Sequence, residues 1–327
     1  MKRRRFLGLV GGAAAWPLAV GAQQTDGMRR IGILMGAADD ADGKARVAAL
    51  REGLQRLGWV EGRTVTMDVR LAGGDVSRMR TNVAELVATA PDVIVATNSA
   101  LLHALGETSR HIPVVFVLVA NVVESGLVES LARPGGNITG FTNFEPAIAG
   151  KWLEILKEAA PRLARVFALH SAETSLYSLS VPHFELAGAR LGVTSIALPV
   201  RDDAEIEQAI DGLAREPNSG LIVMPGPINS VHRHLIFRLA ARHRLPAIYP
   251  YRVYCEAGGL ISYGVDLHDL FRSAASYVDR ILRGEKPGNL PIQTPTRYEL
   301  AINLKTAKAL GIDIPPTLLA RADEVIE

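Results

Sequence analysis

The sequence has 327 residues, more than one hydrophobic core usually organises, so its length predicts two domains. Hydrophobic residues make up 48% and charged residues 21%, which indicates a packed globular protein and excludes a disordered one. The formal net charge is +2, but residues 1–22 carry four basic residues and no acid, so the remainder carries −2. That balance disfavours a nucleic-acid partner. The single cysteine, Cys255, excludes an internal disulfide.

Residues 1–22 have the layout of a signal peptide. A basic start precedes a mildly apolar run, Phe6–Val20, and small residues, Val20 and Ala22, precede the expected cleavage point before Gln23. The run is short and rich in glycine for a membrane span. Residues 3–7, Arg-Arg-Arg-Phe-Leu, resemble the twin-arginine export signal R-R-x-F-L, with an ordinary Sec signal as the alternative. We expect the protein in the periplasm.

Apolar strands and helical stripes alternate through the first half of the mature chain. The pattern predicts strands at 31–35, 65–69, 93–96, 114–117 and 138–141. Helices are expected between them, ending at Gly58, over 76–87, from about Ser99, and near 122–131. Several strands are continuously apolar, which is typical of a parallel sheet covered by helices on both faces.

The same pattern restarts after a junction near 142–146. It predicts strands at 166–169, 194–198, 221–224, 247–249, 260–262 and 299–303. The expected helices are 147–159, 183–191, 204–215, 230–243, 267–282 and 305–310. Pro287, Pro291 and Pro295 punctuate a stretch that would suit a segment crossing between domains. The sequence therefore predicts an α/β protein with two doubly wound parallel-sheet lobes.

Motifs of common catalytic and cofactor sites are missing. We find no Walker A sequence, no G-x-G-x-x-G after a strand and no G-x-S-x-G. His232 and His234 are two apart on an expected helix, so they point in different directions and cannot share a metal ion. Asp39, Asp40 and Asp42 lack the spacing of a calcium loop and are interpreted as a polar loop leading into the first helix. We expect no metal, no cofactor and no enzymatic activity.

Ligands of open α/β sheets bind beyond the carboxyl ends of the strands. Asn98, Ser99 and Ala100 follow the third strand at a helix N-terminus, where free N–H groups suit a carboxylate. Capping of that helix by Asn98 or Ser99 is the alternative, and both can hold at once. The second lobe has strand ends at His170-Ser171, Pro225-Gly226-Pro227 and Tyr249-Pro250-Tyr251. The remaining ligand-binding candidates are Asn121, Phe144, Ser171, Gly226, Tyr249 and Tyr263.

Four stretches resemble a known family: GLVESLARPGGNITG (126–140), LAARHRLPAIYPYR (239–252), GGLISYGVDLHDLFRSAASYVDRILRGEKPGNLP (258–291) and ELAINLKTAKALGIDIPPTLLARADEVIE (299–327). The chain is similar, from about Arg30 to Glu327, to solute-binding proteins of ABC transporters of the tryptophan- and tyrosine-binding type. The resemblance implies a type I periplasmic-binding-protein fold that closes around a small-molecule ligand. It also implies a membrane permease and an ATPase as partners, and we expect a monomer.

The same resemblance implies a hinge of three segments, near 142–145, 262–264 and 291–295, with Asn143, Gly264 and Thr294 as hinge residues. Lobe 1 would comprise 23–143 plus 265–292, and lobe 2 would comprise 144–264 plus 293–327. Each lobe would thus be completed by chain that returns from the other.

Two positions depart from the family pattern. Asn121 stands where many relatives have Asp, and Gly226 stands where relatives often place an acid. An amino-acid ligand needs an anionic partner for its ammonium group, for which Glu145, Glu173 and Asp266 are the candidates. The ligand is therefore expected to be an amino acid or an aromatic or aliphatic acid without the ammonium.

Three other functions share this architecture. A periplasmic sensor domain would have the same fold and no permease. A repressor would need a helix-turn-helix before the first strand, where an export signal stands instead. An exported enzyme using the same cleft would turn its ligand over.

Overall fold

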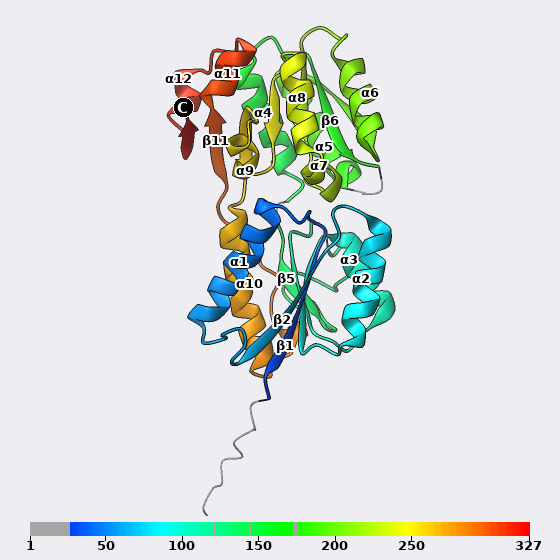
Figure 1. Cartoon of the computed structure of the whole chain (residues 1–327). Helices are drawn as coiled ribbons and strands as arrows, with labels where there is room; N and C mark the ends of the chain where they lie inside the picture. Colours follow the sequence, from blue (N-terminus) through cyan, green and yellow to red (C-terminus); the bar gives the residue numbers. More distant parts are fainter. Residues whose placement is uncertain (1–26, 121, 144, 173–175) are drawn as a thin grey trace, which may run out of the picture.

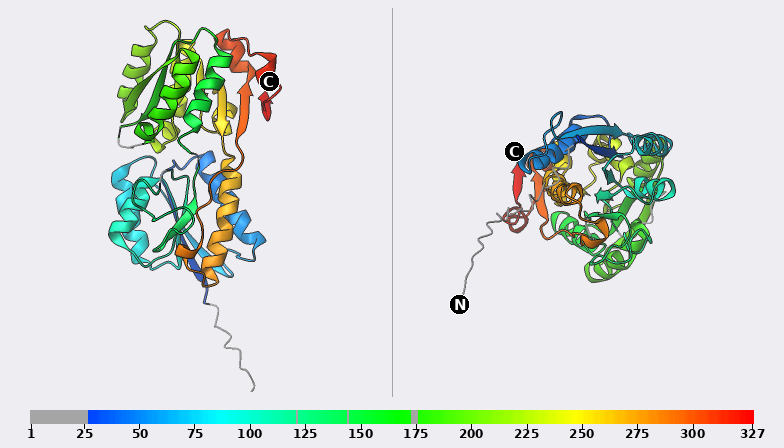
Figure 2. Two further views of the ribbon diagram at one scale, coloured as in Figure 1. Left: turned by 180° about the vertical axis from the view of Figure 1, so that it is seen from behind. Right: turned by 90° about the horizontal axis from the view of Figure 1, so that it is seen from below.

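The structure is a computed structural model that describes residues 27–120, 122–143, 145–172 and 176–327, shown in Figure 1. The expected signal peptide, Asn121, Phe144 and Glu173 lie outside the described residues. Two lobes are stacked end to end, as Figures 1 and 2 show. Within the described ranges, no helix is both long and apolar enough to cross a membrane.

The first lobe contains a parallel sheet in the order β2-β1-β3-β4-β5. Its strands are β1 (Arg29–Met35), β2 (Val65–Leu71), β3 (Val93–Thr97), β4 (Val114–Val117) and β5 (Ile138–Phe141). The helices packed on it are α1 (Ala41–Arg56), α2 (Val76–Ala88), α3 (Ser99–Thr108) and α10 (Leu267–Leu282). One core cluster joins the sheet to α1 and α10, and a second joins its other face to α2 and α3. Both faces are thus covered, as the continuously apolar strands predicted.

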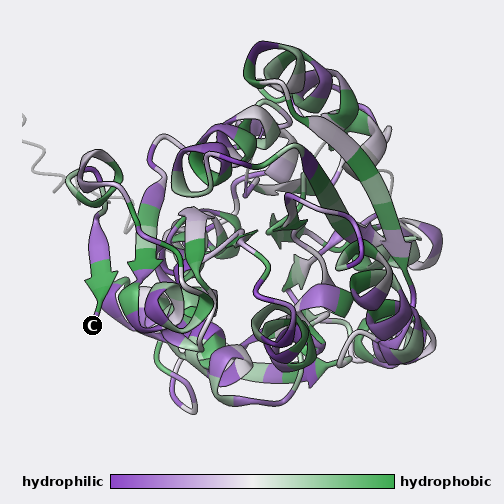
Figure 3. Cartoon of the chain, turned by 90° about the horizontal axis from the view of Figure 1, so that it is seen from above, coloured by the Kyte–Doolittle hydropathy of each residue, from purple (hydrophilic) through white to green (hydrophobic). Residues whose placement is uncertain are grey.

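The second lobe contains a larger sheet in the order β12-β11-β10-β9-β8-β6-β7. Its strands are β6 (Arg165–Ser171), β7 (Thr194–Val200), β8 (Ser219–Val223), β9 (Ala247–Tyr249), β10 (Ile261–Gly264), β11 (Glu299–Asn303) and β12 (Glu324–Ile326). Its helices are α4 (Ile148–Ala159), α5 (Leu176–Leu191), α6 (Asp203–Leu213), α7 (Pro227–Val231), α8 (Arg233–Arg242), α9 (Arg252–Glu256), α11 (Leu304–Leu310) and α12 (Pro316–Leu319). The sheet is parallel except where β11 runs against β10. Figure 3 shows hydrophobic residues concentrated along the strands and on the inner sides of the helices. The α/β fold with two parallel-sheet lobes is therefore confirmed.

The described chain crosses between the lobes at 142–143 with 145–147, at 265–266 and at 290–298. The first and third crossings run side by side, because Thr142 N–H donates to the carbonyl of Gln293 at 2.9 Å and Gln293 N–H donates to Gly140 at 2.9 Å. The second crossing carries the chain from β10 into α10, which packs on α1 of the first lobe (Figure 1). Chain segments far apart in sequence are thus joined at one side of the lobe contact.

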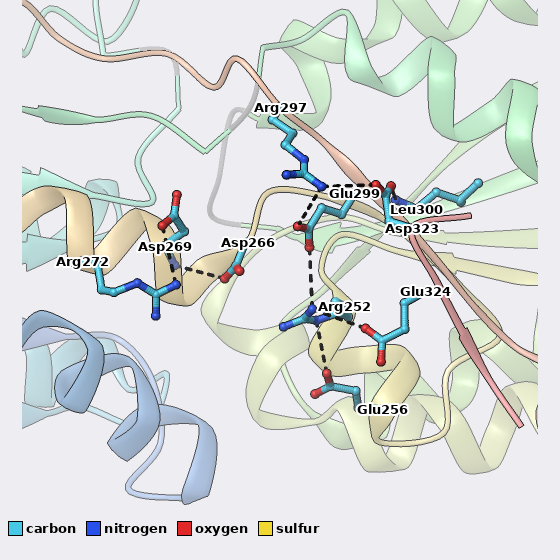
Figure 4. A network of polar contacts seen from close by, with 10 residues as sticks. All are labelled: Arg252, Glu256, Asp266, Asp269, Arg272, Arg297, Glu299, Leu300, Asp323 and Glu324. Atoms are coloured by element: carbon cyan, nitrogen blue, oxygen red, sulfur yellow. Dashed lines mark hydrogen bonds and ion pairs between the residues drawn. The ribbon is translucent and has the colours of Figure 1, made fainter. Parts of the chain in front are cut away.

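A charged network surrounds the second and third crossings (Figure 4). Arg252 contacts Glu256 at 3.2 Å and Glu324 at 3.3 Å, and lies 4.0 Å from Glu299. Burial, and then the charge of Asp266, raise the pKa of the Glu299 carboxyl against the opposing effect of the nearby arginines. Asp266 itself caps α10 by accepting a hydrogen bond from the N–H of Asp269 at 3.1 Å.

The helix expected near 122–131 was wrong. Residues 122–130 form turns, with Leu127 N–H donating to the carbonyl of Val122. Gly126 has φ +71°, a left-handed conformation that interrupts helical hydrogen bonding after one turn. Val122 and Val128 are buried against the sheet, so the apolar spacing that suggested a helix instead anchors a loop. The helix expected at 230–243 is divided at His232 into α7 and α8.

Gly264, the last residue of β10 directly before the second crossing, offers a test of how tightly this segment is packed. A methyl group at this position would lie 1.7 Å from the carbonyl oxygen of Pro250, and a backbone atom cannot easily move away. We therefore expect Gly264→Ala to lower the free energy of unfolding, measured by urea denaturation, by about 1–3 kcal/mol. Gly212→Ala is the matched control, because Gly212 lies in α6 with nothing within 4 Å. Gly212→Ala should raise the free energy of unfolding by about 0.5–1 kcal/mol. Equal effects of the two substitutions would contradict the prediction.

Candidate functional site

The loops that follow strands of the two lobes are in direct contact. A methyl group at Gly36, after β1, would lie 3.3 Å from Cγ of Pro227 in α7. A methyl group at Gly74, after β2, would lie 3.3 Å from Cγ2 of Val231 in the same helix. Because α7 follows β8 of the second lobe, the carboxyl edges of both sheets meet at this interface. This is where an open α/β sheet binds its ligand.

The expected anion site at the start of α3 lies at the same interface. Asn98 caps α3 by accepting a hydrogen bond from Leu101 N–H at 3.0 Å, so the capping alternative is correct. Its amide nitrogen would be 2.1 Å from a methyl group at Gly36, next to Pro227. The backbone N–H groups of Ser99 and Ala100 donate to no acceptor in the described part of the chain. Two free donors at a helix N-terminus therefore remain for an anion.

An ion pair joins the lobes beside this point. Asp40 caps α1 by accepting from Gly43 N–H at 2.8 Å, and it also accepts from Nη2 of Arg233 in α8 at 2.9 Å. Burial alone would raise the pKa of the Asp40 carboxyl, but the hydrogen bonds from Gly43 and Arg233 and the charges of Arg233 and Arg46 outweigh it and lower that pKa. Asp40 is thus held ionised in the lobe contact.

A second pair on α1 faces tyrosines of the other lobe. The Arg46 side chain, only 6% exposed, binds Asp42 through Nε at 3.1 Å and through Nη2. Burial raises the pKa of the Tyr251 and Tyr254 hydroxyls, and their hydrogen bonds with Asn143 and Ser230 oppose that rise. The charges of Arg46 and Asp42 act on both hydroxyls in opposite directions.

Apolar side chains complete the lobe contact. Leu118, directly after β4, and Leu270 of α10 each pack against a core cluster of the first lobe and one of the second. Leu118 has φ +64°, and Asn98, after the neighbouring strand β3, has φ +70°. Such strained residues persist where surrounding structure fixes them, and they gather at binding sites.

The remaining ligand-binding candidates that the structure describes lie in different parts of the second lobe. Ser171 ends β6 and Gly226 precedes α7, so both lie at the carboxyl edge of the second sheet. Tyr249 is only 2% exposed, and its ring packs 5.2 Å from Phe237 and 5.6 Å from Tyr254 in the lobe core. Tyr263 lies in β10 of the second lobe, where its ring stacks on that of Tyr298 at 5.6 Å.

The three residues expected at the hinge lie in or directly beside the crossings. Asn143, in the first crossing, is buried and donates through Nδ2 to the hydroxyl of Tyr251 at 2.7 Å. Gly264 ends β10, and Thr294 lies partly exposed in the third crossing. The hydrogen bond from Asn143 to Tyr251 connects the first crossing to the loop after β9.

The sequence did not indicate the contacts of Arg46, Ser230, Arg233 and Tyr254, of which Arg233 bonds to Asp40 across the lobes. Asp39 and Asp40 lie before the first helix as expected, whereas Asp42 lies in the first turn of α1 and pairs there with Arg46. Tyr251 could have been found, because it follows the same strand end as Tyr249, which was chosen instead. His232 contacts Asp203 of α6, and within the described ranges no group of His, Cys, Asp and Glu side chains is arranged for a metal ion.

Two surface hollows lie away from the lobe contact. One, of about 770 Å³, lies between β7 and α6 and is lined by Phe167, Ile196 and Leu198. The other, of about 700 Å³, includes Arg29 and Asp92 at the amino edge of the first sheet. Neither includes a strand end of both lobes, so we place the candidate site at the interface.

Two facing parallel-sheet lobes joined by three crossings define the class of two-lobed periplasmic binding proteins. The family model of the ABC transporter substrate binding proteins matches residues 31–326, and the chain belongs to that family. A tyrosine-binding protein of Clostridioides difficile (strain R20291) is 24% identical over 333 residues, covering 95% of this chain and 94% of its own.

Solved structures share the fold. An ABC domain from Streptococcus pneumonia in complex with L-Trp matches with a TM-score of 0.85 and 24% identity, covering 92% of this chain and 100% of its own. A conserved domain protein from Vibrio cholerae matches with a TM-score of 0.85 and 24% identity, at coverages of 91% and 100%. A ligand-free, open substrate binding protein from Clostridium difficile matches with a TM-score of 0.66 and 21% identity, at coverages of 91% and 99%.

Removal of the Tyr251 hydroxyl tests the contact between hinge and second lobe. In Tyr251→Phe the amide of Asn143, a residue only 4% exposed, loses its acceptor while staying buried. We expect a loss of about 1–3 kcal/mol in the free energy of unfolding, measured by urea denaturation. Tyr249→Phe should change that free energy by less than about 0.5 kcal/mol, because among the described residues the Tyr249 hydroxyl has no hydrogen-bond partner. A larger loss for Tyr249→Phe would contradict this account.

Proposed function

We propose that the chain captures a small carboxylate-bearing ligand between its lobes and delivers it to the permease and ATPase of an ABC importer. The observation that carries the proposal is the meeting of both carboxyl sheet edges around the free N–H groups of Ser99 and Ala100. A ligand held there would touch both lobes only when they are closed, so binding would shift the population toward closure. Membership in the substrate-binding family supports the assignment.

The chemistry of the interface favours an anionic ligand. The N-terminal N–H groups of α3 and the positive end of its dipole stabilise a carboxylate. The related proteins described as tyrosine-binding and as complexed with L-Trp also take ligands with a carboxylate. Asp40 and Asp42 each already pair with an arginine, so a ligand ammonium would have to compete for them. An aromatic or aliphatic acid thus remains beside the amino acids in the proposed ligand class.

Substrate-binding proteins of ABC transporters act outside the cytoplasmic membrane, and we place this chain in the periplasm as a monomer. The basic residues Arg3 and Arg4, followed by Phe6 and Leu7, support export by the twin-arginine route. A periplasmic sensor domain is the second candidate function. Uptake of a bound ligand into vesicles containing the permease and ATPase would separate import from sensing.

Four compounds separate the ligand groups that matter: L-tryptophan, indole-3-propionate, tryptamine and ribose. We expect one or both carboxylates to raise the melting temperature of residues 23–327, and tryptamine and ribose to leave it unchanged. A ligand at a hundred times its Kd should stabilise the folded chain by about 2.7 kcal/mol. Stabilisation by indole-3-propionate alone would identify an acid without ammonium. Stabilisation only by ribose or tryptamine would overturn the carboxylate assignment, and consumption of a compound would indicate an enzyme.

Position 99 allows the anion site to be tested without unfolding α3. Ser99→Pro removes both the hydroxyl and the N–H at the first helical position, where proline is well tolerated. Hydrogen bonds to charged groups contribute about 1.5–3 kcal/mol, so we expect the Kd of the stabilising carboxylate to rise roughly 10- to 100-fold by calorimetry. Ser99→Ala removes only the hydroxyl and should have a smaller effect. Unchanged affinity in Ser99→Pro would remove α3 from the site.

A further inference from the structure

We propose that the Asp40–Arg233 ion pair is an interlobe latch that holds the lobes closed before any ligand binds. Asp42 and Arg46 pair beside it within the first lobe, and Ser230 and Tyr254 bond beside it within the second. The role of this latch in affinity rests on the proposed function, whereas its effect on the lobes does not. These residues come from the start of α1 on one side and from α7, α8 and α9 on the other.

The Asp40–Arg233 pair has the geometry of an ion pair that stabilises a contact. Its side chains are 32% and 15% exposed, and the oxygen and nitrogen are 2.9 Å apart. Both partners are fixed within their own lobes, because Asp40 caps α1 and Arg233 donates through Nη1 to the Ser230 carbonyl at 2.8 Å. The entropy lost when long flexible side chains pair at a surface is therefore small here. Since the partners belong to different lobes, the pair can form only when the lobes meet.

The charge of Arg46 is paired within the first lobe. Its side chain is 6% exposed and that of Asp42 is 15% exposed, and Nε and Nη2 of Arg46 donate to the two carboxylate oxygens of Asp42. On the facing lobe the hydroxyl of Tyr254 is bound to Ser230 Oγ at 2.8 Å. A buried charge without a partner would oppose closure until a ligand neutralised it. These charges already have partners, so closure of this part of the interface needs no ligand.

Apolar contacts act in the same direction. Leu118 and Leu270 pack against core clusters of both lobes, and their exposure would rise if the lobes separated. Burial of apolar surface and pairing of charges thus both favour the closed arrangement. For a binding protein that recognises its ligand only when closed, apparent affinity is the intrinsic affinity multiplied by the fraction of closed molecules. Loss of the latch would lower affinity by the same factor as it lowers that fraction.

The distance between spin labels on the two lobes, measured by pulsed electron resonance, tests the proposal. Arg80→Cys in α2 and Glu207→Cys in α6 place exposed labels on the side of the molecule away from α10 and β11 (Figures 1 and 2). Native Cys255 is fully buried, and burial raises the pKa of its thiol to about 12, so it should resist labelling. The chain, residues 23–327, is unfolded, dialysed and refolded to remove any ligand that copurifies.

Asp40→Asn and Arg233→Gln are the informative substitutions. Asparagine still caps a helix as well as aspartate does, so Asp40→Asn removes the charge and spares α1. Arg321→Gln is the control, because Arg321 pairs with Glu158 inside the second lobe. We expect one short distance to dominate in the parent and in Arg321→Gln, and a longer distance to gain population in both latch variants. The double variant should resemble either single variant, because both remove the same pair.

Two outcomes would overturn the latch: a parent that already shows the long distance, or latch variants that keep the short one. The measurement contains no ligand, so its result is independent of the compound panel. A chain that closes through the latch but binds none of the four compounds would retain this inference while the carboxylate assignment failed. A chain that binds a carboxylate with unchanged affinity in Asp40→Asn and Arg233→Gln would retain the function and lose the latch.

Discussion

Everything in this molecule depends on two parallel sheets that face each other along their carboxyl edges. In a parallel sheet with crossover helices, each strand ends, and the next helix begins, at the same edge. Free N–H groups and loop side chains of both lobes are therefore brought to a single interface. Gly36 and Gly74 let the loops of the first lobe approach α7, because a side chain at either position would meet the second lobe within 3.3 Å. The site is thus a consequence of topology before any particular side chain is considered.

Much of this topology could be predicted from the sequence. Helix α10 begins and ends as predicted, at Leu267 and Leu282, because its apolar stripe is regular, Asp266 caps it and Gly284 follows it. The buried strands were equally clear, since continuous apolar runs have few other uses in a soluble protein. The segment 122–131 was predicted as a helix, and Val123, Leu127 and Leu131 do follow one another at the four-residue spacing of a helical face. In that loop the left-handed Gly126 overrode the pattern.

The site was predicted less well, because the residues that pair there are far apart along the chain. Asp40 and Arg233 are 193 positions apart, and nothing in the spacing of either indicates the other. Tyr249 ends β9 and Tyr251 follows it, and both rings are buried in the same core cluster. Only the Tyr251 hydroxyl reaches the first crossing, where it accepts a hydrogen bond from Asn143, and nothing in the local pattern distinguishes the two tyrosines in this respect. The local sequence pattern therefore located the edge of the sheet, but it did not determine which side chains of the two lobes pair there.

The two strained residues at that edge connect local structure to lobe movement. Asn98 and Leu118 follow the adjacent strands β3 and β4, and both have positive φ, which costs of order 1–3 kcal/mol for a residue other than glycine. Asparagine tolerates this conformation, whereas leucine does so only where packing holds it. Leu118 is held by core clusters of both lobes, so separation of the lobes would remove half of that support. Relaxation of Leu118 in an open state would then move the chain directly beyond β4, next to the N-terminus of α3. The packing of Leu118 therefore couples the conformation of the residue directly after β4 to the contact between the lobes.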